Sequence, residues 1–142
     1  MSSHNQQTLR EFIEAVWNQG DLEAIPQFLG SEYSIHHDPG DPWEGQTLTV
    51  QGFQERVRIS REPIPDQRFD IQQIYSDATT VCITWSWRGT HLGVISGFSP
   101  TGRTLQMSGA TVYFFDPAGQ IIGHWQIADR LGIYQQLTAD PG

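Results

Sequence analysis

The sequence predicts an α+β domain in which N-terminal helices pack on one face of a strongly curved, antiparallel or mixed sheet. Apolar residues recur with a helical period up to about Val57, and from Gln67 onward they alternate as in β-strands. Helices followed by a run of antiparallel strands are typical of the α+β class. Because 142 residues without repeats or linkers fit one domain, we expect a single domain over residues 1–142. A sheet that wraps around the helices would enclose a pocket.

The first predicted helix has one apolar face, formed by Leu9, Phe12, Ile13, Val16 and Trp17. These side chains follow the i, i+3, i+4, i+7, i+8 spacing of an amphipathic helix. We expect Gly20 to end this helix and Asp21 to cap a second one. The second helix is expected to span only one or two turns, because Pro26 does not fit a helix interior.

A short strand, Tyr33–His37, is predicted next, followed by a loop over 38–45 that is rich in Pro, Gly and Asp. A third helix then ends before the prolines at 63 and 65, and its apolar face carries Val50, Phe53 and Val57. The helical period stops at this point, so the remaining chain is expected to form the main part of the sheet.

Alternation predicts the strands of the second half. The first is expected to hold four residues on one face: Phe69, Ile71, Gln73 and Tyr75. The next has an apolar face of Val81, Ile83, Trp85 and Trp87. Strands over 104–115 and from Ile121 to about Asp129 are expected to form a hairpin, because Asp116-Pro117-Ala118-Gly119 has the residues of a tight turn.

Composition excludes several classes of partner. The net charge is −8, from 8 Lys and Arg against 16 Asp and Glu, which disfavours nucleic acid and anionic membrane surfaces. A single cysteine, Cys82, excludes a disulfide within the chain and a Cys-rich metal site. The N-terminus is polar, and no apolar run reaches the roughly 18 residues of a membrane helix. We therefore expect a soluble, cytoplasmic protein.

Three stretches, taken in order, resemble the SnoaL-like polyketide cyclase family of the NTF2-like superfamily. They are Trp17-Asn18-Gln19-Gly20-Asp21-Leu22; Arg88-Gly89-Thr90-His91-Leu92-Gly93 with Gly97-Phe98-Ser99-Pro100-Thr101-Gly102; and Gly123-His124-Trp125-Gln126-Ile127-Ala128-Asp129 with Leu131-Gly132 and Gln135-Gln136-Leu137. The resemblance extends from Phe12 to Leu137 and implies an NTF2-like cone that encloses one small-molecule pocket. Each stretch alone is a weak signal, but their combination and order carry the resemblance.

The resemblance also implies a chemistry. Characterised SnoaL-like cyclases close a ring on an aromatic polyketide by intramolecular aldol addition, without a metal or a redox cofactor. A carboxylate whose pKa is raised by an apolar pocket can take and return the proton, and a histidine can orient it. We therefore expect a cofactor-independent enzyme acting on a hydrophobic ketone or polyketide-like substrate. Because this fold hosts many functions, a non-catalytic binding domain and a hydroxylase or hydrolase stay open as alternatives.

Asp129 is the expected acid/base, because the resemblance places the family's aspartate there and it ends an apolar strand. The alternatives are an ion pair with Arg130 or Arg88, or a cap on a C-terminal helix. His124 is the second catalytic candidate. The odd separation of the two residues puts them on opposite faces of a regular strand unless a bulge intervenes.

Further candidates are expected around the pocket. His37 is a catalytic candidate, although His36 and His37 are adjacent and at most one of them faces inward. Six residues are expected to contact the substrate: Trp17, His36, Trp43, Gln106, Ser108 and Gln126. Gln126 shares a strand face with His124, and Trp125 and Ile127 share one with Asp129, so one of these two sets lines the pocket.

Three expectations concern other roles. His91 is expected to bond the backbone of its loop. No metal is expected, because His-x-His and His-Glu-x-x-His spacings are missing from the sequence. A homodimer is expected to form through the sheet, on an exposed face formed by Val81, Ile83, Trp85 and Trp87.

Overall fold

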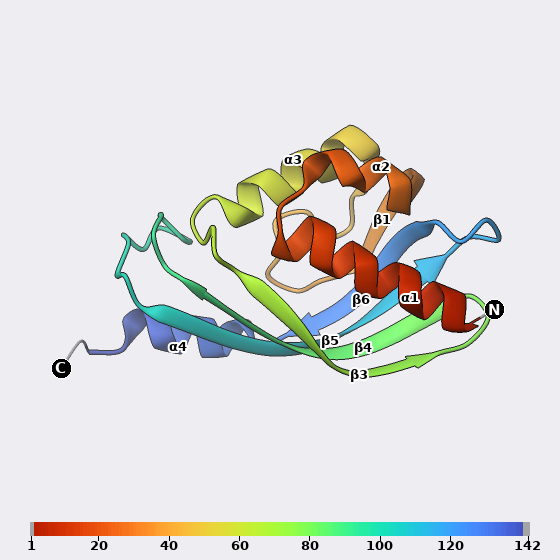
Figure 1. The fold of residues 1–142 in the computed structure, drawn as a ribbon. Coiled ribbons are helices and arrows are strands. Elements are labelled where there is room, and N and C mark those ends of the chain that lie inside the picture. Colours follow the sequence, from red (N-terminus) through yellow and green to blue (C-terminus); the bar gives the residue numbers. More distant parts are fainter. Residues whose placement is uncertain (1, 141–142) are drawn as a thin grey trace.

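The fold was obtained as a computed structural model, which describes residues 2–140. Its elements in chain order are α1 (Ser2–Phe12), η1 (Ile13–Asn18), η2 (Leu22–Ala24), α2 (Ile25–Phe28), β1 (Leu29–His37), β2 (Thr47–Thr49), α3 (Val50–Arg61), β3 (Arg68–Ser76), β4 (Thr80–Thr90), β5 (Thr104–Phe115), β6 (Ile121–Ala128) and α4 (Arg130–Thr138). Figure 1 shows α1, α2 and α3 packed on one face of a curved sheet, with α4 at the end of the sheet farthest from the N-terminus. This arrangement confirms the predicted α+β cone.

The sheet has six strands in the order β2-β1-β6-β5-β4-β3. Every neighbouring pair is antiparallel except β1 and β6, which are parallel. In that pair Ile35 is opposite His124, and His37 is opposite Trp125. Since the carboxyl ends of two parallel strands lie at the same edge of a sheet, the loop after β1 and the end of β6 come together there.

The first helix packs as its apolar pattern predicts. Its five apolar residues are all buried and face the sheet, and the last turn, η1, widens into a π-helix. Gly20 follows with φ +71, a left-handed conformation that ends the helix. Asp21 occupies the cap position of η2, but its side chain makes no capping hydrogen bond there. The expected Asp21 cap is therefore wrong.

A β-bulge changes the expected face of β3. The ladder pairs Ile71 with Trp85 and Gln73 with Thr84, which leaves one extra residue on β3. Beyond this point the side chains change sides, so Ile74 packs against the core and Tyr75 is 60% exposed. The prediction that Gln73 and Tyr75 share a face with Ile71 is wrong for this reason.

The apolar face of β4 is buried inside the cone. Val81, Ile83, Trp85 and Trp87 are at most 7% exposed and belong to the core that faces the helices. They cannot form the exposed dimer face that the sequence analysis expected, because the curvature of the sheet turns them inward. Within the part of the chain that the structure describes, no helix is long and apolar enough to span a membrane.

Candidate functional site

A cavity of about 160 Å³ lies between the helices and the concave face of the sheet. Its aromatic walls come from Trp17, Tyr33, Phe69, Trp85, Trp87 and Tyr113. Its polar lining includes Asp41, Arg56, Gln67, His124, Gln126 and Arg130. A cavity of roughly 150 Å³ is large enough for benzene, so this space has room for about one six-membered ring.

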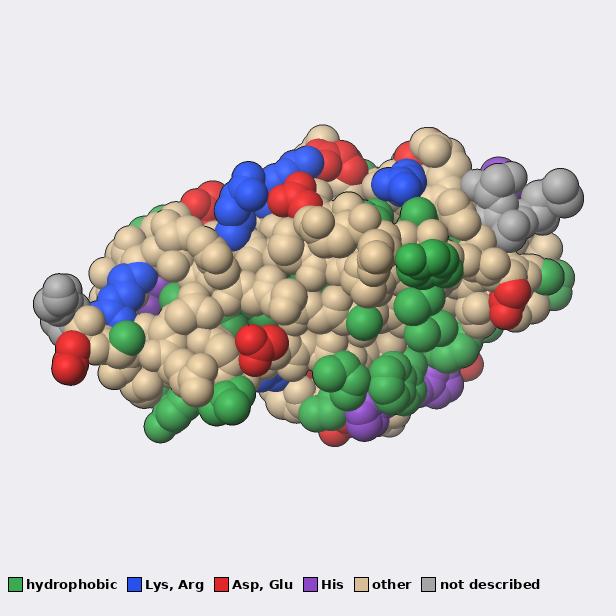
Figure 2. Space-filling view, turned by 90° about the horizontal axis from the view of Figure 1, so that it is seen from below, with side chains coloured by type: hydrophobic (Ala, Val, Ile, Leu, Met, Phe, Trp, Pro, Cys, Tyr) green, Lys and Arg blue, Asp and Glu red, His purple; other side chains and the backbone are tan. Residues whose placement is uncertain are grey.

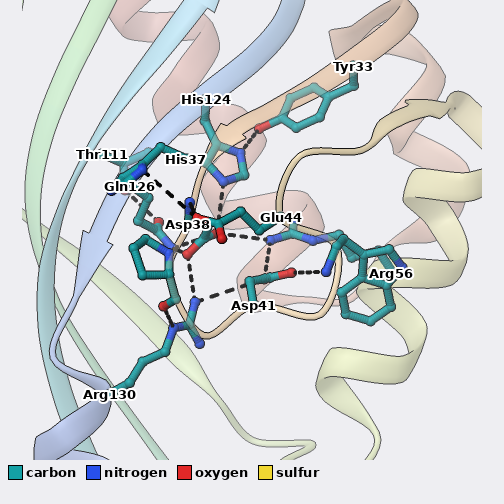
Figure 3. Close-up of polar contacts among 12 residues, drawn as sticks. Tyr33, His37, Asp38, Asp41, Glu44, Arg56, Thr111, His124, Gln126 and Arg130 are labelled. Carbon is teal, nitrogen blue, oxygen red and sulfur yellow. Dashed lines mark hydrogen bonds and ion pairs between the residues drawn. The ribbon is translucent and has the colours of Figure 1, made fainter.

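Asp38 is the centre of the polar network beside this cavity (Figure 3). Its side chain is 1% exposed and accepts hydrogen bonds from His124 Nε2 at 2.9 Å, from Arg130 Nη2 at 2.7 Å and from Gln126 Nε2 at 3.1 and 3.2 Å. Arg56 Nη2 is 3.6 Å away. Burial acts to raise the Asp38 pKa, but the hydrogen bonds from His124 and Arg130 outweigh it and hold the pKa below its ordinary value. Asp38 is therefore an anion at neutral pH.

His124 connects this carboxylate to a buried tyrosine. Its Nδ1 lies 2.6 Å from the Tyr33 hydroxyl. Burial is the main reason that the His124 pKa is lowered, so the ring is neutral at pH 7. Burial also raises the Tyr33 pKa well above its ordinary value, which keeps the phenol protonated. The network assigns the tautomer: Tyr33 O–H donates to Nδ1, and Nε2–H donates to Asp38.

Gln126 is held in one orientation by the neighbouring strands. Trp85 Nε1 donates to Thr111 Oγ1 at 2.9 Å, and the Thr111 hydroxyl donates to Gln126 Oε1 at 2.6 Å. The Gln126 amide nitrogen is thereby left to donate to Asp38. One hydrogen-bond chain thus crosses β4, β5 and β6 and ends on the same carboxylate as His124.

A second ion pair lies at the rim of the cavity. Arg56 Nη2 contacts Asp41 Oδ2 at 2.8 Å, and both side chains are less than 10% exposed. The guanidinium carbon lies 5.3 Å from the Trp17 ring centre and 5.8 Å from that of Trp43. Arg56 Nε has no hydrogen-bond partner among the described residues. A buried cation at the edge of a cavity suits a ligand that brings an oxygen acceptor.

The structure brings three of the predicted site residues to the cavity. His124, Gln126 and Trp17 line it, which identifies the His124–Gln126 face as the inward face of β6. Trp125 and Ile127, on the other face, are 42% and 47% exposed. Alternation along β6 left open which of its two faces lines the pocket, and the curvature of the sheet decides it.

Trp43 lies next to the site without being one of the residues that line the cavity. It packs on Arg56, and its backbone N–H donates to Asp41 Oδ1 at 2.8 Å. Its place is therefore to support the ion pair at the rim.

Asp129 lies outside the cavity. It is exposed, occupies the N-cap position of α4 and accepts a hydrogen bond from the Gly132 N–H at 2.9 Å. This is the capping geometry that the sequence analysis gave as an alternative. Gln106 and Ser108 are exposed on the same outer side, where a shallow hollow is lined by all three residues. Asp129 was expected to be the acid/base in the pocket, and its position outside the cavity shows that this expectation is wrong.

The two adjacent histidines also lie away from the cavity. The His37 ring stacks on Trp125 at 4.7 Å, and the His36 ring packs edge-on against Phe114 at 5.2 Å. Both contacts are on the outer side of the sheet, where Trp125 is exposed. His91 is fully buried, and its Nδ1 bonds Thr101, as expected for a structural role.

Four members of the site are not among the site residues predicted from the sequence: Tyr33, Asp38, Asp41 and Arg56. The loop over 38–45 is predicted from its Pro, Gly and Asp content, and its two aspartates are the available signal. Arg56 gave no signal, because a charged residue in a surface-type helix pattern is ordinarily solvated. Among the residues that the structure describes, no group of three His, Cys, Asp or Glu side chains is arranged to hold a metal ion.

A curved sheet closed by helices over one polar and aromatic cavity defines a small-molecule pocket protein of the NTF2-like fold. The model of the SnoaL-like polyketide cyclases matches residues 7–137, and the chain belongs to this family. A search of curated proteins gave no match.

Solved structures agree with this assignment. A protein of Acidithiobacillus ferrooxidans that is proposed to be a polyketide cyclase is 49% identical, with 96% of each chain covered and a TM-score of 0.90. IdmH of Streptomyces antibioticus, also proposed to be a polyketide cyclase, is 27% identical over 95% of this chain and 99% of its own, with a TM-score of 0.80. AclR of Streptomyces galilaeus, proposed to be a hydroxylase, is 18% identical over 100% of this chain and 85% of its own, with a TM-score of 0.81, and shows the fold alone.

Proposed function

We propose that this protein is a cofactor-independent, cyclase-like enzyme that performs aldol-type chemistry on a hydrophobic ketone or polyketide-like substrate. The observation that carries the proposal is the Tyr33–His124–Asp38 hydrogen-bond chain beside an aromatic cavity. A neutral histidine oriented by an anionic carboxylate is a suitable general base. In this proposal the carboxylate that acts through His124 is Asp38, and Asp129, the acid/base expected from the sequence, takes no part.

The proton moves along the chain in two steps. The substrate C–H proton passes to the Tyr33 oxygen while the Tyr33 proton passes to His124 Nδ1, which gives an enolate and an imidazolium ion. Asp38 stabilises the imidazolium through its 2.9 Å contact with Nε2. After the enolate carbon attacks a second carbonyl of the same substrate, the reverse transfer protonates the new alkoxide. Atoms and charges balance without a further reactant.

Arg56 is the proposed partner of the enolate oxygen. Arg56 is one of the residues that line the cavity, and its side chain is only 6% exposed. A buried, fixed cation stabilises charge that develops in the transition state more strongly than water does. Asp41 and the Trp17 and Trp43 rings hold the guanidinium in place before the substrate binds.

The experiment measures deuterium incorporation at the α-carbon of benzyl methyl ketone in D₂O by NMR. This probe has one ring and needs only the first proton transfer, so it does not depend on knowing the natural substrate. The wild-type protein should accelerate exchange above buffer, and His124→Gln should lower the acceleration by about 100-fold or more. Asp129→Asn is the matched control and should leave exchange unchanged. Full exchange in His124→Gln would sink the proposed mechanism.

A non-catalytic binding domain is the second candidate, favoured by one observation. Asp38 accepts hydrogen bonds from three side chains, a degree of satisfaction that also suits a purely structural buried network. The same probe separates the two functions. Binding of the ketone without exchange above the buffer rate would support the binding domain and contradict the enzyme.

We also propose that the homodimer forms through the outer face of β6, in place of the β4 face. Ile122, Trp125 and Ile127 are 36–47% exposed on that face. Figure 2 shows apolar side chains gathered on this side of the molecule, beside histidine side chains. Contiguous exposed apolar surface of this kind is typical of an interface between copies. Sedimentation at micromolar concentration should give a dimer that Trp125→Asp converts to monomer, and a monomeric wild type would contradict the interface.

A further inference from the structure

We propose that a second, apolar compartment next to the cavity binds an extended apolar part of the ligand. The compartment, called the vestibule here, lies between the loop over 91–103 and α4 and has a volume of about 340 Å³. The inference deepens the proposed function, on which it rests for placing the ketone-bearing ring in the inner cavity. It narrows the substrate class to molecules with a ring-sized ketone head and a long apolar extension.

The vestibule adjoins the inner cavity. Trp87, Met107 and Arg130 line both spaces, so these three side chains stand between the two compartments. The inner cavity of about 160 Å³ is smaller than the roughly 300–1,000 Å³ of usual ligand pockets. With the vestibule added, the site falls within that range. We infer that a ligand larger than one ring extends past the three shared residues into the vestibule.

The walls of the vestibule determine the chemistry of its occupant. Apart from Arg130 and Ser96, they consist of apolar or aromatic side chains and Gly40, with Ile64, Ile95, Phe98, Leu105, Ile133 and Leu137 prominent among them. The loop and α4 meet where Phe98 packs edge-on against Tyr134 at 6.0 Å. Tyr134 is 56% exposed, and Ile95, Phe98 and Ile133 are only partly buried. Alkyl or aryl groups of a ligand would remove this surface from water.

Arg130 is the charged residue that the two compartments share. Its Nη2 bonds Asp38 at 2.7 Å, and its Nε donates to the Pro39 carbonyl at 2.8 Å. Gly40 has φ +92, and a Cβ at this position would overlap with the Arg130 stem. The missing side chain at Gly40 therefore lets Arg130 lie against the loop, where it is held by the Pro39 carbonyl.

The test uses benzyl alkyl ketones that share one head and differ in chain length from methyl to nonyl. Dissociation constants are measured by tryptophan fluorescence, because Trp85 and Trp87 line the inner cavity. Each methylene group that enters the vestibule should tighten binding by roughly two- to fourfold, until the space is filled. The double variant Ile95→Asn with Ile133→Asn should flatten this dependence while leaving the affinity for the methyl ketone unchanged.

The control is Ile59→Asn on α3, which should retain the full dependence on chain length, because Ile59 is 42% exposed and lines neither compartment. The vestibule would be overturned if the affinity of the wild type did not depend on chain length, or if the double variant kept the same dependence as the wild type. Deuterium exchange is followed on the same compounds. Binding that depends on chain length without deuterium exchange would support the vestibule and contradict the proposed function. Exchange together with an affinity that does not depend on chain length would support the proposed function and contradict the vestibule.

Discussion

His124 Nε2 lies 2.9 Å from an Asp38 carboxylate oxygen, although the two residues are 86 positions apart in the chain. The contact follows from the parallel pairing of β1 and β6, in which Ile35 is opposite His124. Asp38 is the first residue after β1, at the edge where both strands end. A loop carboxylate therefore reaches an imidazole that projects inward from the neighbouring strand.

Asp38→Asn should lower both stability and exchange activity, because it removes the anion that faces Arg130 and Arg56. Removing one partner of a buried ion pair lowers the free energy of unfolding by about 3–5 kcal/mol. Asp129→Asn should change the free energy of unfolding by less than about 0.5 kcal/mol, since Asn caps a helix as well as Asp does. Urea unfolding of both variants checks the comparison. Equal destabilisation would contradict the assignment of Asp38 as the centre of the network.

Tyr33→Phe should separate the packing role of the ring from the role of its hydroxyl. The ring contacts Phe53 at 4.7 Å and is kept, whereas the 2.6 Å hydrogen bond to His124 is lost. An unsatisfied buried acceptor costs about 1–3 kcal/mol. Exchange of the ketone probe should fall by at least about 10-fold because the proton path is broken. Wild-type exchange in a folded Tyr33→Phe protein would exclude Tyr33 from the relay.

The pH dependence of stability should show two losses on acidification. Burial, opposed by the Asp38 hydrogen bond, lowers the His124 pKa in the folded state below the ordinary value of 6.5. As the pH falls below about 6.5, the unfolded chain takes up this proton first, so stability decreases. The Asp38 pKa is also lowered, so its contribution is present above about pH 3.8 and lost below it.

Thermal unfolding between pH 8 and pH 3 checks this profile. His124→Gln should remove the loss near pH 6 and reduce the one near pH 4, because the His124 hydrogen bond also lowers the Asp38 pKa. His36→Gln, on the outer face of the sheet, is the matched control and should leave both. A wild-type stability that rises between pH 7 and pH 5 would contradict the lowered His124 pKa.

Gly109→Ala should disturb the aromatic wall of the cavity. Gly109 pairs with Trp85 on β4, and an added Cβ would lie 2.6 Å from the Ile127 carbonyl oxygen and overlap with the Trp85 ring. Overpacking of this kind costs about 1–3 kcal/mol. The expected signature is a lower unfolding temperature with weaker ketone binding. Gly97→Ala, in open space on the loop, should leave ketone binding unchanged and lower stability only through its positive φ.

Local patterns explain why much of the fold could be predicted. The helical spacing of Leu9 to Trp17, the turn at 116–119 and the alternation along β6 depend on residues close together in the chain. The turn forms as expected, with the Gly119 N–H donating to the Asp116 carbonyl at 2.9 Å and Gly119 at φ +83. The family resemblance extended these local signals to the order of the elements.

The sequence by itself determined which residues of β6 share a face, but only the tertiary structure decided that the His124–Gln126 face lines the cavity. A two-residue period has two equivalent faces, and the direction of sheet curvature chooses between them. The same holds for β4, whose apolar face is interior. Asp38 and Arg56 reach the site through the pairing of β1 with β6 and the packing of α3, contacts between distant segments that local patterns do not encode. Asp129 could be placed near the end of a strand, but the helix that it caps decided which way its carboxylate points.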